Sequence, residues 1–325
     1  MTLTYFRYLV ALAHERHFGR AAEKCHVSQP TLSVAIKKVE EELGIQLFER
    51  GASEVKITET GWRIVAQAEK VLIEASHIEE IAAAGKDPLA GPLRLGVIYT
   101  IGPYLLPRLI PRVHQRAPRM PLVIQENYTA RLSEALKRGE LDVIVISLPF
   151  EAPGIVTQSL YDEPFRALLP ASHPWAGREK IVPAELGEEQ ILLLGAGNCF
   201  REQVLEVCPL CQNAGGLQRT LEGSSLETIR HMVASGLGVT VLPSTAADEL
   251  EASNPLVAVR PFACPEPSRR IVLAWRVTYP RSGAIDILRA AILDSDLPGV
   301  QPIGPVPARE NAEKEEITMA KQTVV

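Results

Sequence analysis

The sequence lacks a long hydrophobic run, an even set of cysteines and an excess of positive charge. Its longest apolar run near the start covers residues 8–13, which is too short for a signal peptide or a membrane span. No membrane contact is therefore expected. The 325 residues include five cysteines, an odd number, so a structural disulfide framework is not expected either. Both absences favour a protein of the reducing cytoplasm.

The charge balance by itself gives no indication of nucleic-acid binding. The chain has a net charge of −5, and within residues 1–60 eight basic residues are balanced by eight acidic ones. A surface for nucleic acid must therefore be inferred from the arrangement of side chains. With 46% hydrophobic and 22% charged residues the chain is typical of globular proteins, and its length predicts two or three structural units.

Residues 4–44 have the pattern of a helix-turn-helix. Two stretches with helical spacing of apolar or small residues come before a turn, and Ser28 then precedes Pro30 as a plausible helix cap. The helix that follows keeps one apolar stripe until Gly44 ends it. Two short strands with a loop over residues 46–61 predict a wing.

The pattern of apolar residues divides the rest of the chain into two regions. Residues 58–85 form one long helical pattern with a single narrow apolar seam, which requires a partner helix, most simply from a second copy of the chain. After a hinge-like segment, short apolar runs alternate with helical patterns. This alternation predicts an α/β region with mainly parallel strands, and about 210 residues suit two lobes with a cleft between them.

Four segments are expected from these patterns. They are a winged helix-turn-helix domain over 1–58, a linker and dimerisation helix over 59–87, a two-lobed α/β domain over 88–300 and a disordered tail over 301–325. The tail is predicted from its proline-rich and then charged composition.

The first sixty residues resemble the signature of the LysR-type transcriptional regulators. The matching positions are Ala21, Ala22, the run from Ser28 to Ser33, Ile36, Glu40, Leu43, Gly44, Leu47, Phe48, Arg50 and Thr58. The resemblance implies a winged helix-turn-helix, a linker helix for dimerisation and a two-lobed sensor region like a periplasmic binding protein.

The resemblance also implies residues that contact DNA. A recognition helix enters the major groove with its N-terminal residues leading. Gln29 could read a base edge there, while hydroxyl groups and basic side chains hold phosphates. Ser28 has the alternative role of a helix cap alone, and the two lysines could be only a solvated surface. The full candidate set is Ser28, Gln29, Pro30, Thr31, Ser33, Lys37, Lys38 and Arg50.

Three cysteines lie within residues 199–211. Glycines precede Cys199, and the stretch from Cys199 to Cys208 reads as a helix that begins at the first cysteine. A helix N-terminus and the nearby Arg201 both stabilise a thiolate. Nine residues of helix rise about 14 Å, whereas a disulfide needs Cα atoms within about 7 Å. If the two cysteines form a disulfide, the helix between them must unfold, so the oxidation changes the conformation of this segment.

Three stretches, residues 91–111, 194–208 and 225–243, together resemble OxyR, the hydrogen-peroxide-sensing branch of the LysR family. This resemblance implies that Cys199 is peroxidatic, that Cys208 is resolving, and that Thr100 and Thr129 hold the peroxide. It departs at Asn198, where the branch has a histidine, and asparagine can hydrogen-bond peroxide or thiolate but cannot titrate. Oxidation is then expected to reshape a homotetramer, a dimer of dimers, on promoter DNA and to activate genes of peroxide defence together with RNA polymerase.

Other interpretations compete with this one. Cys25 and Cys264 are expected to be buried small hydrophobic residues. Cys211 could be incidental, could compete as resolving partner or could pair with Cys208. No cofactor is expected, and no zinc site either, because a structural zinc usually needs four ligands and no second cysteine pair is present.

Two other functions remain open. One is a LysR-type regulator that binds a small metabolite in the cleft and has incidental cysteines. The other is a thiol peroxidase or a disulfide oxidoreductase. The DNA-reading pattern and the lack of a strand–CxxC–helix context argue against an enzyme.

Overall fold

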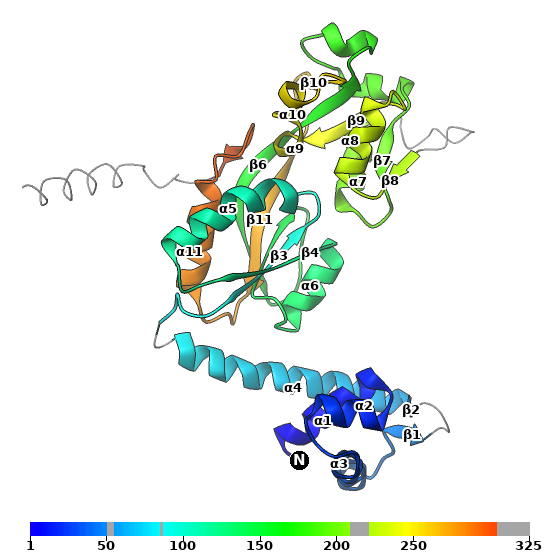
Figure 1. Cartoon of the computed structure of the whole chain (residues 1–325), viewed down its shortest axis with the longest axis vertical. Coiled ribbons are helices and arrows are strands. Elements are labelled where there is room, and N and C mark those ends of the chain that lie inside the picture. Colours follow the sequence, from blue (N-terminus) through cyan, green and yellow to red (C-terminus); the bar gives the residue numbers. More distant parts are fainter. Residues whose placement is uncertain (51–54, 85–86, 209–220, 304–325) are drawn as a thin grey trace, which may run out of the picture. The chain divides into compact units, whose positions relative to one another are not determined.

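The computed structural model describes residues 1–50, 55–84, 87–208 and 221–303. It consists of two compact units that divide at Asp87 (Figure 1). Among the described residues, no helix is both long and apolar enough to cross a membrane.

The first unit is a winged helix-turn-helix, which confirms the sequence prediction. Its elements are α1 (Leu3–Glu15), α2 (Phe18–Lys24), α3 (Gln29–Leu43), the antiparallel pair β1 (Phe48–Arg50) and β2 (Val55–Ile57), and α4 (Glu59–Ala84). The apolar stripe predicted for the third helix lies in the core of this unit, because Leu32, Ile36 and Val39 are all buried there.

Local side-chain chemistry sets the ends of these helices. Ser28 caps α3 by accepting a hydrogen bond from the Thr31 backbone N–H, at 3.3 Å, and Pro30 occupies the first turn. Gly44 ends α3 in the left-handed conformation with φ of 69°. The Thr58 hydroxyl accepts from the Gly61 N–H, at 2.9 Å, and so begins the long helix α4.

Helix α4 leaves part of its apolar surface uncovered. Val65 and Ala68 pack into the first unit, but Trp62 is 49% exposed and Ile78 is 69% exposed. Among the α4 side chains whose burial is described, the buried ones, Val65 and Ala68, share one face of the helix, in line with the narrow seam of the sequence pattern.

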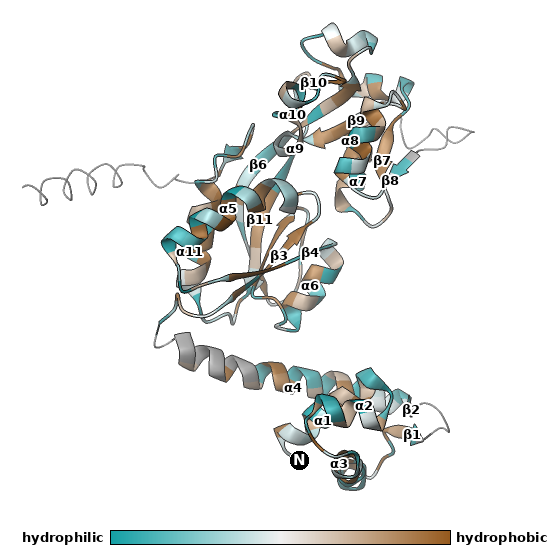
Figure 2. Cartoon of the chain, in the orientation of Figure 1, coloured by the Kyte–Doolittle hydropathy of each residue, from teal (hydrophilic) through white to brown (hydrophobic). Residues whose placement is uncertain are grey.

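The second unit has two hydrophobic cores. The first core lies around β3 (Leu93–Ile98), α5 (Gly102–Arg116), β4 (Leu122–Asn127), α6 (Thr129–Lys137), β5 (Val143–Ser147) and α11 (Ser282–Leu293). The second lies around β7 (Leu192–Leu194), α7 (Cys199–Val207), β8 (Leu221–Gly223), α8 (Leu226–Ala234) and β9 (Thr240–Pro243), with α9 (Ser244–Ala247), α10 (Leu250–Ser253) and β10 (Val257–Pro261). Figure 2 shows β3 of the first lobe and β9 of the second coloured mainly as hydrophobic.

Two long strands join the lobes. β6 (Ile155–Pro170) places Leu160 and Tyr161 in the first core and Phe165 in the second. β11 (Ser268–Arg276) pairs with it and with β5. The described sheet runs in the order β10-β6-β11-β5-β3-β4, and β9 and β12 (Gln301–Pro302) also pair with β6.

The expectation of mainly parallel strands is wrong for this unit. β3 pairs in parallel with β4 and with β5, and β7 pairs in parallel with β8. All described pairings of β6 and β11 are antiparallel. The reason is that these strands return between the lobes instead of following a crossover helix.

The predicted tail begins too early. Gln301 lies opposite Asp162 of β6, and the Ile303 N–H donates to the Leu160 carbonyl at 2.8 Å. These backbone hydrogen bonds extend the ordered sheet to residue 303. Residues 304–325 lie outside the described part of the chain.

Candidate functional site

One small cavity in the second unit brings together four of the residues that the sequence singles out. Its lining residues are Ile98, Tyr99, Thr100, Asn127, Tyr128, Thr129, Gly197, Asn198 and Cys199. The volume of the cavity is about 10 Å³. A space of this size holds about one water molecule, so a small oxidant comes close to it in size and a metabolite is far too large.

Three junctions between a strand and a helix build the cavity. Thr100 follows β3, Thr129 begins α6 just after β4, and Cys199 begins α7. Since β3 and β4 are parallel, with Ile98 opposite Asn127, their carboxyl ends bring two loops to the same place. Ligands of open α/β sheets bind at such ends.

Cys199 has a free, partly buried thiol at the first position of α7. The Thr129 hydroxyl donates a hydrogen bond to its sulfur, with an Oγ1–Sγ distance of 3.7 Å. The sulfur thus lines the cavity with a hydrogen-bond donor beside it. This is the placement that a sulfur nucleophile needs toward a small oxidant.

Two neighbours of the cysteine have partners of their own. Asn198 lines the cavity and donates from Nδ2 to the Gly195 carbonyl at 3.0 Å. Arg201, expected beside the sulfur, instead donates to the Leu194 carbonyl and to Glu222, both at 2.7 Å. The carboxylate of Glu222 draws this guanidinium to the edge of β8.

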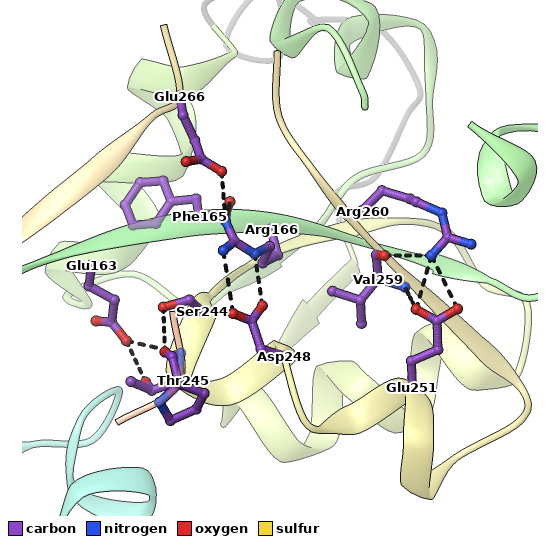
Figure 3. Close-up of polar contacts among 11 residues, drawn as sticks. Glu163, Phe165, Arg166, Ser244, Thr245, Asp248, Glu251, Val259, Arg260 and Glu266 are labelled. Atoms are coloured by element: carbon purple, nitrogen blue, oxygen red, sulfur yellow. Dashed lines mark hydrogen bonds and ion pairs between the residues drawn. The ribbon is translucent and has the colours of Figure 1, made fainter. Parts of the chain in front are cut away.

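Arg269 carries no sequence signal, yet it holds one wall of the cavity. From β11 its guanidinium donates to the Thr100 hydroxyl at 2.8 Å and to the Thr100 carbonyl at 3.0 Å. Its ion pair with Glu163, at 2.8 Å, is fully buried, and Glu163 also accepts from Thr245 (Figure 3). Because the Thr100 oxygen already accepts from Arg269, the Thr100 proton is available for a molecule in the cavity.

Helix α7 spans the two predicted redox cysteines, as the sequence indicates. It buries Phe200 and Val204, and the Phe200 ring packs edge to face on Phe165 with centroids 5.3 Å apart. Cys199 packs against the first core, whereas Cys208 is fully buried in the second. The two side chains therefore belong to different hydrophobic cores.

Cys208 is disulfide-bonded in this structure. Cys211, for which the sequence left several roles open, lies outside the described residues. Gln203, which the sequence does not single out, ties α7 to the end of β5. Its Nε2 donates to the Ser147 hydroxyl at 2.8 Å and to the Leu148 carbonyl at 2.9 Å. This side chain is a polar anchor that holds the helix in place.

The candidate DNA-reading residues lie along α3 and the wing. Most of them are exposed, and Ser33 is half-buried; the exposed ones are Ser28, Gln29, Pro30, Thr31, Lys37 and Lys38. Ser28 has a structural role as a cap, and its hydroxyl also bonds to that of Thr31 at 2.8 Å. Arg50 ends β1.

The two lysines of α3 have weak partners within the chain. Lys37 lies 3.6 Å from Glu41, and the Lys38 ammonium lies 5.7 Å from the centre of the Tyr5 ring. Both side chains remain exposed, so they keep their charge toward solvent. Val34 was missed by the sequence reasoning: it is 68% exposed on the helix that carries these lysines.

The remaining described cysteines differ from expectation in part. Cys25 is half-buried against the first unit's core, and this burial raises the pKa of its thiol. Cys264 is exposed, so the expectation of a buried side chain is wrong, because the residue lies in the loop between β10 and β11. Within the described ranges, no group of three or more His, Cys, Asp or Glu side chains is arranged to hold a metal ion.

Comparison with known proteins agrees with this architecture. The model of the bacterial regulatory helix-turn-helix protein of the lysR family matches residues 3–62, and that of the LysR substrate binding domain matches residues 86–296. Over 293 residues the chain is 41% identical to the DNA-binding transcriptional dual regulator OxyR of Escherichia coli K12, covering 90% of this chain and 95% of that protein. The chain belongs to the OxyR branch of the LysR family.

Solved structures of this branch share the fold. A full-length OxyR variant from Pseudomonas aeruginosa is 52% identical, with a TM-score of 0.75 over 94% of this chain and 99% of that one. A hydrogen-peroxide-bound OxyR cysteine variant from Corynebacterium glutamicum is 30% identical, with a TM-score of 0.60 over 99% of this chain and 95% of that one.

Proposed function

We propose that this chain is a DNA-binding transcriptional activator that senses hydrogen peroxide through Cys199. The main support is the small cavity at the Cys199 sulfur, whose size suits peroxide and whose Thr129 hydroxyl is aimed at the sulfur. The naming of curated relatives as hydrogen peroxide-inducible genes activators agrees with this function.

The sensing step is a two-electron oxidation of sulfur. The Cys199 thiolate attacks one oxygen of hydrogen peroxide, a sulfur–oxygen bond forms and the oxygen–oxygen bond breaks. Cys199 becomes a sulfenic acid, and the leaving hydroxide combines with the proton that the thiol released on ionisation, which gives water. The Thr100 proton and the Thr129 hydroxyl lie at this cavity and would orient the peroxide, with Asn198 as a further polar wall.

The second step joins Cys199 to Cys208. The Cys208 thiolate attacks the sulfenic sulfur, hydroxide leaves and is protonated to water, and a disulfide forms. Because Cys208 is disulfide-bonded in this structure, a thiol reductant must first convert it to a thiol. Pairing also requires α7 to unwind, since its nine residues hold the two ends about 14 Å apart. Phe200 and Val204 then leave the second core, and this is the change of shape.

The output is control of promoter DNA. In this proposal residues 1–58 bind DNA, with Gln29 at base edges and the hydroxyls, lysines and Arg50 at phosphates. Residues 59–87 link the copies of a homotetramer, and residues 88–300 sense peroxide. The exposed Trp62 and Ile78 on α4 support an intermolecular contact there. RNA polymerase is the expected partner in activation.

The proposed setting is the cytoplasm, and the proposed protein is not an enzyme. Each oxidation changes the shape of the sensor once and must be reversed by a thiol reductant. The helix-turn-helix of the first unit would let the oxidation change DNA binding, and a peroxidase has no need of such a domain.

The competing function is a regulator that binds a metabolite between the lobes. The cavity at Cys199 is too small for such a ligand. The two functions differ in their dependence on this cysteine, which makes them separable by a single substitution.

The test uses the full-length chain and duplex DNA that it selects from a randomised library. After reduction, the footprint on the selected duplex is recorded before and after hydrogen peroxide. Peroxide is expected to change the footprint for the wild type and for the control Cys264→Ser, whose side chain is exposed elsewhere. Cys199→Ser should not respond. A Cys199→Ser protein that still responds would overturn the proposal and leave the metabolite function in place.

A further inference from the structure

The way into the Cys199 cavity is bounded by two aromatic rings. Among the lining residues, Tyr99 is 45% exposed, Tyr128 is 40% exposed and Gly197 is also exposed. The other lining residues are buried or half-buried. The lining residues that face solvent are therefore Tyr99, Tyr128 and Gly197.

The two rings form a fixed pair. Their centroids lie 5.4 Å apart with an interplanar angle of 76°, an edge-to-face arrangement. The backbone brings the two rings together. Ile98 of β3 lies opposite Asn127 of β4, and Tyr99 and Tyr128 are the residues that directly follow them. The Tyr128 N–H also donates to the Asn127 side chain at 2.9 Å. An edge-to-face arrangement is one of the favoured geometries of aromatic pairs.

Each tyrosine directly precedes a hydroxyl residue of the site. Tyr99 is followed by Thr100, whose position is held by Arg269, and Tyr128 is followed by Thr129, which donates to the Cys199 sulfur. The rings are thus placed by the same two loops that place the polar groups of the cavity.

We propose that Tyr99 and Tyr128 act as a size filter that admits hydrogen peroxide and excludes bulky organic hydroperoxides. This inference rests on the proposed function of Cys199. The chemistry does not discriminate by itself, because a thiolate attacks an alkyl hydroperoxide in the same way: sulfenic acid forms, the oxygen–oxygen bond breaks and an alkoxide leaves, to be protonated by water. Only the space for the alkyl group differs.

The available space makes the distinction sharp. The cavity holds about one water-sized molecule, so the alkyl group of tert-butyl or cumene hydroperoxide must occupy the region of the two rings. A pocket discriminates by roughly 10–200-fold for one methylene group, and the alkyl groups of these hydroperoxides add several carbons at once. Removal of the rings should therefore change selectivity more than reactivity.

The experiment measures the rate constant of sulfenic acid formation at Cys199, by trapping and mass spectrometry, in the reduced full-length chain. The oxidants are hydrogen peroxide, tert-butyl hydroperoxide and cumene hydroperoxide. The variants are Tyr99→Ala, Tyr128→Ala and the double alanine variant. The matched controls are Tyr99→Phe and Tyr128→Phe, which keep each ring and remove only the hydroxyl.

The expected result is a change in the ratio of the rate constants. In the double alanine variant the preference for hydrogen peroxide over the organic hydroperoxides should fall by at least about tenfold, while the phenylalanine variants keep it. The rate with hydrogen peroxide should stay within about threefold of wild type, which also shows that the variants are folded.

Two outcomes would overturn the size filter. One is an unchanged ratio in the double alanine variant. The other is a loss of the hydrogen peroxide reaction itself, which would make the rings part of the reaction instead of a filter. Failure of the proposed function is distinguishable from both, because Cys199 of the wild type would then not react with hydrogen peroxide at all.

Discussion

Val204→Ala should speed up disulfide formation, because Val204 anchors the helix that must unwind. This side chain is 3% exposed in the second core, on the buried face of α7. The substitution removes two methylene equivalents, and at about 0.8 kcal/mol each it destabilises the folded helix by about 1.6 kcal/mol before any cavity effect. If α7 leaves the core before Cys199 and Cys208 meet, the same contacts are absent from the rate-limiting state. The barrier then falls by the same amount, which corresponds to about a 15-fold faster reaction.

Val233→Ala is the matched control for this substitution. Val233 is fully buried in the same core but lies on α8, which does not carry a redox cysteine. It should lose similar stability in urea unfolding without a change in the rate. The assay reduces the full-length chain, adds hydrogen peroxide, blocks thiols at set times and quantifies the Cys199–Cys208 peptide. Equal rate changes in the two variants, or no change for Val204→Ala, would refute the view that α7 unwinding limits the step.

Three further substitutions test other parts of the structure, with the exposed Glu134→Gln on α6 as common control for the acids. Glu163→Gln leaves the buried Arg269 guanidinium without its counter-charge, so urea unfolding should show a loss of about 3–5 kcal/mol, against less than about 1 kcal/mol for the control. Burial raises the pKa of the Glu126 carboxyl above its ordinary value of 4.5. The folded state therefore binds this proton more tightly than the unfolded state does. The free energy of unfolding should fall as the pH rises from about 4.5 through the pKa of the folded state. Glu126→Gln should flatten this dependence and be more stable than wild type at pH 7, and an unchanged pH profile would contradict the assignment. Val34→Ala should weaken binding to selected duplexes with thymine but not to those with uracil, since the exposed valine would contact a thymine methyl group; equal losses on both duplexes would contradict this contact.

Local patterns made much of the fold predictable. The cap at Ser28, the proline of the first turn and the end at Gly44 are short-range signals, and the structure has α3 within the bounds that they predict. The helix between Cys199 and Cys208 was predictable for the same reason: glycines precede it and its apolar residues share one face. The two-lobed arrangement was indicated by the length of the alternating α/β region and by the resemblance to a known family.

Long-range pairing was not predictable from this single sequence. Arg269 and Thr100 are 169 positions apart, and neither residue carries a signal that points to the other. The course of β6 was missed in the same way, because charged residues and a proline interrupt its apolar pattern at Asp162, Glu163 and Pro164. Such charges are tolerated in a strand here because the neighbouring β11 supplies arginines that pair with them.

The most direct test of the account is to map which cysteines react with peroxide. The full-length chain is fully reduced with a dithiol, treated with one equivalent of hydrogen peroxide, blocked within seconds, digested and analysed for linked peptides. The account predicts a Cys199–Cys208 link that forms far faster than any link in the Cys199→Ser protein. A Cys199 that remains a thiol under these conditions would contradict peroxide sensing at this site.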